Sequence, residues 1–162
     1  MIKDIITLQF PDRTETAQDK ALVTEYPFGQ AKVSSHNQWS RKTASGFRLH
    51  AATAEGASSV GWVLPDPKAF AKLQFFAQLA VTDSCPVRLK VEVKRNKRVT
   101  VSQDFHIGSM EPARISVGIP RYKSSMEITV HAVSLQMEPK PKYAVVDLSG
   151  PVLQTVGKPG RY

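Results

Sequence analysis

Six basic side chains are concentrated in one short segment, Val87 to Ser102, which reads VRLKVEVKRNKRVTVS. They are Arg88, Lys90, Lys94, Arg95, Lys97 and Arg98, and the only acidic residue among them is Glu92. Lysine and arginine side chains displace counterions from the phosphates of a nucleic acid, and they also attract acidic glycans and acidic proteins. Because the whole chain carries a net charge of +8, the segment predicts a surface for an anionic partner.

The same charges also fit the wet face of a half-buried β-hairpin. Val87, Leu89, Val91 and Val93 alternate with the charged residues, which then fall on the opposite face of the strand. Proteins that bind single-stranded nucleic acid normally interleave aromatic residues with the charges, and no aromatic residue occurs between Pro86 and Asp104. Nucleic acid is therefore the third choice of partner, and its binding would weaken steeply with added salt.

Aromatic side chains are the second group of residues with a possible binding role. An aromatic ring suits the apolar side of a sugar ring, as it suits other flat apolar groups. Trp39 lies in the polar stretch SSHNQWSRK, and we select it together with Tyr122 as a candidate glycan-binding residue. Trp62, in GWVLP, has apolar neighbours and is predicted to lie in the core.

Catalytic and metal-binding motifs are not recognisable in the sequence. The four histidines are widely spaced, and Cys85 has no Cys-His motif around it. No phosphate-binding glycine loop, Gly-x-Ser-x-Gly elbow or dinucleotide fingerprint occurs. We therefore expect a protein that is not an enzyme. The histidines are His36, His50, His106 and His131.

The fold that must position these residues is predicted to be all-β. Short runs of alternating apolar and polar residues, separated by Gly and Pro, predict an antiparallel β-sandwich of jelly-roll type with about eight strands. In MEITVHAVSLQM the apolar phase slips by one residue near His131 and Ala132, which predicts a bulge or a bend.

Three segments are predicted along the chain. Residues 1–43 form an N-terminal edge strand and loop segment, residues 44–148 the sandwich core, and residues 149–162 an extended C-terminal arm rich in Gly and Pro. The N-terminus lacks the features of a signal peptide, and no window reaches the length of a membrane span. We expect synthesis in the cytosol and no membrane partner.

From Gly46 onward the sequence resembles carbohydrate-binding-module-like and galactose-binding-like jelly rolls. GFRLHAA is similar to their early strand, KLQFFAQLAV to the central apolar strand, VRLKVEVKRNKRVTVS to the next hairpin and YAVVDLSGPVL to the final strand. The resemblance implies a sandwich that binds glycans without catalysis. It also implies a structural calcium ion held partly by Asp147, although the N-terminal motif that supplies the other ligands is not recognisable.

Three functions follow from these observations. A stand-alone sandwich with extended ends and no export signal is typical of a virion structural protein, such as a phage capsid decoration, head-fibre or tail component. Such a protein would bind other virion proteins or its own copies. The alternative is a carbohydrate-binding or adhesion module, and the third function is nucleic-acid binding through the basic hairpin.

Overall fold

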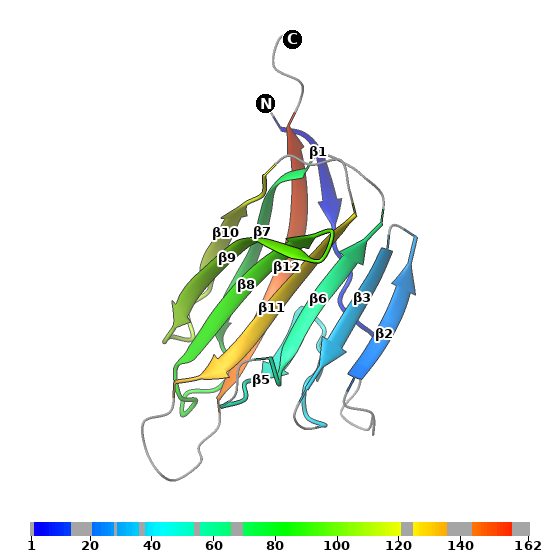
Figure 1. The fold of residues 1–162 in the computed structure, drawn as a ribbon. Coiled ribbons are helices and arrows are strands. Elements are labelled where there is room, and N and C mark those ends of the chain that lie inside the picture. The colour runs from blue at the N-terminus through cyan, green and yellow to red at the C-terminus, as the bar shows by residue number, and fades with distance from the viewer. Residues whose placement is uncertain are drawn as a thin grey trace.

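The computed structural model describes residues 2–13, 21–27, 29–35, 38–53, 56–65, 70–120, 125–135 and 144–156. Within these residues, twelve β-strands form two antiparallel sheets packed face to face (Figure 1). The predicted all-β sandwich is confirmed, with twelve strands rather than about eight. The described residues contain no helix able to span a membrane.

The first sheet, here sheet A, has the strand order β10-β7-β12-β5-β4, and β1 pairs with β12 beside this path. Its β12 is central, because it pairs with β5, with β7 and with β1. The strands of sheet A are β1 (Ile2–Thr7), β4 (Arg41–Lys42), β5 (Gly46–His50), β7 (Phe70–Leu79), β10 (Ala113–Gly118) and β12 (Val145–Val156).

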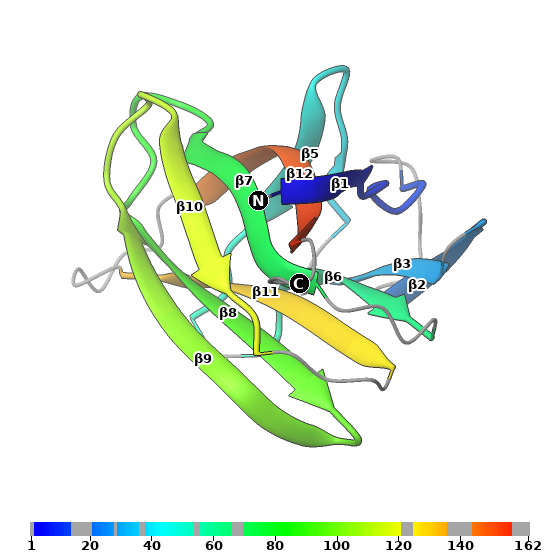
Figure 2. The same ribbon diagram turned by 90° about the horizontal axis from the view of Figure 1, so that it is seen from above.

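The second sheet, sheet B, has the strand order β2-β3-β6-β11-β8-β9. Figure 2 shows this sheet along one side of the molecule and sheet A along the other. The strands of sheet B are β2 (Ala21–Tyr26), β3 (Gly29–Ser34), β6 (Ser59–Leu64), β8 (Val87–Arg95), β9 (Arg98–Ile107) and β11 (Met126–Ser134).

Alternating residues build the core between the two sheets. Val87, Leu89, Val91 and Val93 of β8 point inward and are fully buried, as their spacing predicts. Trp62 of β6 is 1% exposed, which confirms the prediction that it lies in the core. Its indole Nε1 donates a hydrogen bond to the carbonyl oxygen of Gln9 at 2.6 Å, so the buried polar group is satisfied.

The segment of residues 1–43 is part of the sandwich. It contributes β1 to β4, and β3 pairs with β6 from Gln30 opposite Val63 to Ser34 opposite Ser59. The predicted edge strand in IITLQF is β1, which lies beside the second half of β12. Of the other strands in this segment, β2 and β3 form one margin of sheet B, and β4 pairs with β5 at the edge of sheet A.

The predicted C-terminal arm differs in the structure, because β12 continues through Val156. Pro151 and Leu153 are buried within it. Gly150 has a φ of 59°, and the pairing of β12 with β7 shifts register between Ser149 and Val152. The Gly-Pro pair thus forms an irregularity inside a strand rather than its end. Residues 157–162 lie outside the described residues.

The predicted bulge near His131 and Ala132 is absent. β11 pairs with β8 without a break, from Met126 opposite Arg95 to Ser134 opposite Val87. Ala132 continues the inward phase, and Val133 is buried on the other face because the segment at Ala52 runs beside it. Val133 is therefore apolar because the segment at Ala52 covers this end of β11, and not because the register changes.

Candidate functional site

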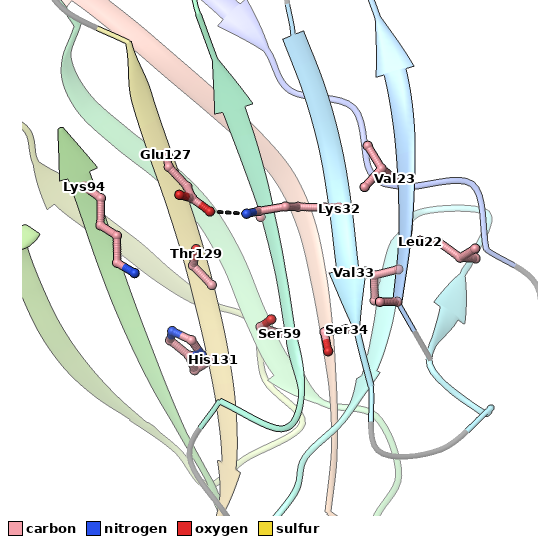
Figure 3. A pocket seen from close by; sticks show the side chains of 12 residues that line it. Leu22, Val23, Lys32, Val33, Ser34, Ser59, Lys94, Glu127, Thr129 and His131 are labelled. Atoms are coloured by element: carbon pink, nitrogen blue, oxygen red, sulfur yellow. Dashed lines mark hydrogen bonds and ion pairs between the residues drawn. The ribbon is translucent and has the colours of Figure 1, made fainter. Parts of the chain in front are cut away.

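A hollow of about 300 Å³ lies on the outer face of sheet B, the face turned away from sheet A. Figure 3 shows its side chains, which come from β2, β3, β6, β8 and β11. Most of them are polar or charged, and the apolar ones gather at the β2 end. The lining residues are Ala21, Leu22, Val23, Lys32, Val33, Ser34, Ser59, Gly61, Lys94, Glu127, Thr129 and His131.

The hollow is deepest over β6 because Gly61, at its base, has no side chain. Strand register places Gly61 between Lys32 of β3 and Thr129 of β11. A Cβ atom at position 61 would lie 2.2 Å from the carbonyl oxygen of Ile128, which is far inside contact distance. Glycine is thus required by the close approach of the two strands, and it opens the space between its neighbours.

Charged side chains bridge the hollow. Lys32 donates to the carboxylate of Glu127, and this ion pair spans from β3 to β11 across Gly61 (Figure 3). Each side chain of the pair is about one third exposed. Next to the hollow, a ring nitrogen of His131 lies 2.7 Å from Oε1 of Glu92 on β8. The two acids therefore each have a basic neighbour.

Lys94 is the remaining cation of the hollow. It lies on the outer face of β8, opposite Glu127 in the strand register, and it pairs with no side chain of the part of the chain described here. The ammonium group adds three hydrogen-bond donors and one positive charge to a wall that also carries the hydroxyl of Thr129. Together these groups can bind hydroxyl and anionic groups of a ligand.

The outer face of sheet B lacks an aromatic surface among the described residues. The Phe, Tyr and Trp residues of its strands, Tyr26, Trp62 and Phe105, all pack against the core. The hydroxyl of Tyr26 instead donates a hydrogen bond to the carbonyl oxygen of Phe10. A ligand in the hollow would therefore be held by hydrogen bonds and charge rather than by ring stacking.

The basic surface predicted for an anionic partner is only partly formed. Arg88, Lys90 and Lys94 share the outer face of β8, whereas Arg95 follows the inward phase and is 3% exposed. Its assignment to this surface is therefore wrong. The alternation that turns Val93 inward also turns residue 95 inward, two positions later.

Lys97 and Arg98 lie at the exposed tip of the same hairpin. Asn96 and Lys97 have φ angles of 51° and 66°, and Arg95 pairs with Arg98. These values match a two-residue type I′ turn, the connection that fits the twist of antiparallel strands. The turn projects its two cations beyond the end of β8 next to Lys94.

Trp39 is 49% exposed in the connection between β3 and β4. The hydroxyl groups of Ser35 and Ser40 hydrogen-bond each other at 2.8 Å, and Ser40 also accepts the backbone N–H of His50 at 2.9 Å. Trp39 does not line the hollow. It lies five positions after Ser34 in the sequence, so it is within about 18 Å of that end of the hollow. Tyr122, the other aromatic candidate, lies outside the described residues.

Asp147 does not fit the calcium site that the jelly-roll resemblance implied. Both of its carboxylate oxygens accept hydrogen bonds from Arg48, from Nε at 2.9 Å and from Nη2 at 3.2 Å. A guanidinium cation this close would repel a second cation. Among the described residues, no three His, Cys, Asp or Glu side chains are grouped so that they could hold a metal ion.

Several residues of the hollow were not selected from the sequence. Lys32, Gly61 and Thr129 lie in three different strands, and nothing in their local patterns marks them. Lys32 and Thr129 occupy the outward position of an alternating strand, which is the available signal, whereas Gly61 lies in a short apolar run. Only the strand order β3-β6-β11 brings them side by side.

Comparison with known proteins identifies the fold. No family model and no curated protein sequence matches the chain. Among solved structures, the CBM22-1 xylan-binding domain from Paenibacillus barcinonensis Xyn10C is 13% identical and has a TM-score of 0.53, with 96% of this chain and 97% of that chain covered.

Two further structures agree with this similarity. The CBM22-1-CBM22-2 tandem domain of the same enzyme gives a TM-score of 0.53 at 14% identity, over 96% of this chain and 46% of that chain. The CBM36-1 domain of a multidomain xylanase from the hindgut metagenome of Trinervitermes trinervoides gives 0.50 at 8% identity, over 78% of this chain and 93% of that chain. The chain therefore has the jelly-roll sandwich fold of non-catalytic carbohydrate-binding modules, as its strand pattern indicated.

Proposed function

We propose that this protein is a non-catalytic carbohydrate-binding domain that holds part of a polysaccharide in the hollow on sheet B. The observation that carries the proposal is the open hollow of about 300 Å³, lined mostly by polar and charged residues, on the face of a carbohydrate-binding-module-like sandwich. Sugar hydroxyl groups both donate and accept hydrogen bonds. The hollow offers donors on Lys32 and Lys94, an acceptor carboxylate on Glu127 and a hydroxyl on Thr129.

The comparisons support glycan binding better than a virion structural role. The structures similar to this chain include a xylan-binding domain and a domain of a xylanase, and none of the observations points to a virion. The extended tail that favoured assembly begins, in its first eight residues, as a paired strand of sheet A. Residues 149–156 are therefore part of sheet A and are not available as an arm between subunits.

The test is affinity electrophoresis of the full chain through gels that contain soluble polysaccharides, both neutral and acidic, followed by calorimetry on those that retard it. The critical variant is Lys32→Ala combined with Glu127→Ala. Because both members of the ion pair are removed together, neither charge is left uncompensated and the fold is retained. We expect the variant to lose at least about tenfold in affinity, because two of the main polar contacts disappear.

The matched control is Arg48→Ala combined with Asp147→Ala, which removes a cross-strand ion pair from the outer face of sheet A. It should bind polysaccharide like the unmodified protein. Equal binding by the hollow variant, or no retardation in any gel, would overturn the proposal. Trp39→Ala in the same panel distinguishes binding confined to the hollow from binding that extends onto the β3–β4 connection.

A further inference from the structure

Charge is distributed unevenly over the hollow. Glu127 is neutralised by Lys32, and Glu92 lies against His131. Lys94 has no such partner among the described residues, although it lines the same space. Lys97 and Arg98 stand at the turn that continues its strand. Lys94 therefore gives the β8 side of the hollow a positive charge that forms no ion pair within the described residues, with Lys97 and Arg98 beyond it at the turn.

The chemistry of the lining narrows the kind of glycan that the hollow can select. Without an aromatic surface, a neutral sugar would gain affinity mainly from hydrogen bonds that replace its contacts with water, and such exchanges have a small net value. A hydrogen bond between an ammonium group and an anion is about twice as strong as one between neutral groups. A sugar that carries a carboxylate would use Lys94 in this way.

The two acids of the region argue against a densely charged polymer. Glu127 lines the hollow and Glu92 lies beside it on β8, so successive phosphates of a nucleic acid would meet these carboxylates as well as Lys94. An acidic sugar instead combines one carboxylate with several hydroxyl groups. Its hydroxyl groups can donate to Glu127 while its carboxylate accepts from Lys94.

We propose that the hollow selects an acidic polysaccharide, with the carboxylate of a uronic acid bound by the ammonium group of Lys94. This inference rests on the proposed function and adds the substrate class to it. Lys94 binds the charge, Lys32 with Glu127 binds hydroxyl groups, and the exposed side chain of Val23 contacts the carbon face of the next sugar.

The experiment compares polygalacturonate with its fully methyl-esterified form, which keeps the same backbone and removes the charge. Affinities are measured by calorimetry for the unmodified chain and for the variants Lys94→Gln, Lys94→Arg and Lys72→Gln. Lys72 lies on β7 in sheet A, so its variant has the same net charge as Lys94→Gln without altering the hollow. A single-stranded oligonucleotide serves as a polyanion without uronic acid.

We expect the acidic polymer to bind about five- to tenfold more tightly than its ester. Lys94→Gln should remove this preference, and Lys94→Arg and Lys72→Gln should keep it. Equal affinity for polymer and ester would overturn the acidic specificity but leave glycan binding intact, whereas no binding to either polymer or to the neutral panel would remove both proposals. Equal loss in Lys94→Gln and Lys72→Gln, or equally tight binding of the oligonucleotide, would instead show general charge attraction and overturn the inference.

Discussion

Arg48 on β5 and Asp147 on β12 form a two-pronged ion pair across adjacent strands of sheet A, with N···O distances of 2.9 Å and 3.2 Å. The strand register places the two residues directly opposite each other. The hydrogen bonds from this guanidinium to Asp147 raise the pKa of Arg48 above its ordinary value. Arg48 therefore keeps its positive charge across the ordinary pH range, and Asp147 has a cation as its partner.

The first prediction concerns Asp147→Asn. The change weakens a partly exposed ion pair, so we expect the free energy of unfolding to fall by about 1 kcal/mol. Urea unfolding measures this value. Because Arg48 occupies both carboxylate oxygens, calcium or EDTA should shift the Tm of the variant and of the unmodified protein equally. A calcium-induced rise in Tm that Asp147→Asn abolishes would contradict this interpretation.

Lys97→Gly should stabilise the protein. Lys97 has a φ of 66°, a left-handed conformation that costs a residue with a Cβ about 1 kcal/mol and costs glycine almost nothing. The change also creates the Asn-Gly sequence preferred in type I′ turns. We expect the unfolding midpoint in urea to rise. The control Arg98→Gly, at the start of β9, should lower it instead.

Stability should fall at alkaline pH in a way that depends on Tyr26. Burial, and next the nearby charge of Asp12, raise the pKa of the Tyr26 hydroxyl above its ordinary value of 10.0. As pH rises, the unfolded chain therefore loses this proton before the folded protein does. The stability that the protonated Tyr26 hydroxyl gives to the folded state is complete below pH 10 and is lost as pH rises through the folded-state pKa.

Tyr26→Phe tests this dependence. The variant should be about 1 kcal/mol less stable at neutral pH, because its hydrogen bond to the carbonyl oxygen of Phe10 is lost. The difference from the unmodified protein should then shrink as the pH increases beyond 10. Urea unfolding at a series of pH values gives the free energy of unfolding of each protein as a function of pH. Parallel curves for the two proteins would be evidence against a raised pKa of Tyr26.

Leu153→Ala examines the second half of β12. Leu153 is fully buried, so its truncation should cost about 2–5 kcal/mol. Gln154 is the adjacent residue on the opposite face, and Gln154→Ala should change stability by less than about 0.5 kcal/mol. Similar small effects for both variants would contradict the assignment of residues 149–156 to β12 and would support the extended arm expected from the sequence.

The strands of the sandwich could be predicted wherever one face is buried. The alternation from Val87 to Val93 gave the correct inward face of β8, and the apolar surroundings of Trp62 gave its place in the core. Arg95 was assigned to the surface because of its charge, although its position in the alternation indicates the inner face. In that case the period of the strand was the better guide than the type of side chain.

The hollow could not be predicted, because it depends on the order of strands in space. Lys32 and Glu127 are separated by 95 residues and meet only because β3 and β11 both flank β6. Gly61 between them was interpreted as part of a short apolar run. Similarly, Gly150 and Pro151 indicated a strand end, and only the tertiary pairing of β12 shows that the strand passes through them.

The pairing of Ile2 with Val156 joins residues from opposite ends of the described chain. A contact between such distant positions requires closure of a loop that contains nearly all of the described residues. Sheet topologies with many long-range pairings fold slowly, in milliseconds to seconds. During synthesis the β1 strand must wait until β12 has left the ribosome, so the seam between the two strands forms as one of the last steps of folding. Both strands are exposed to aggregation until that seam closes.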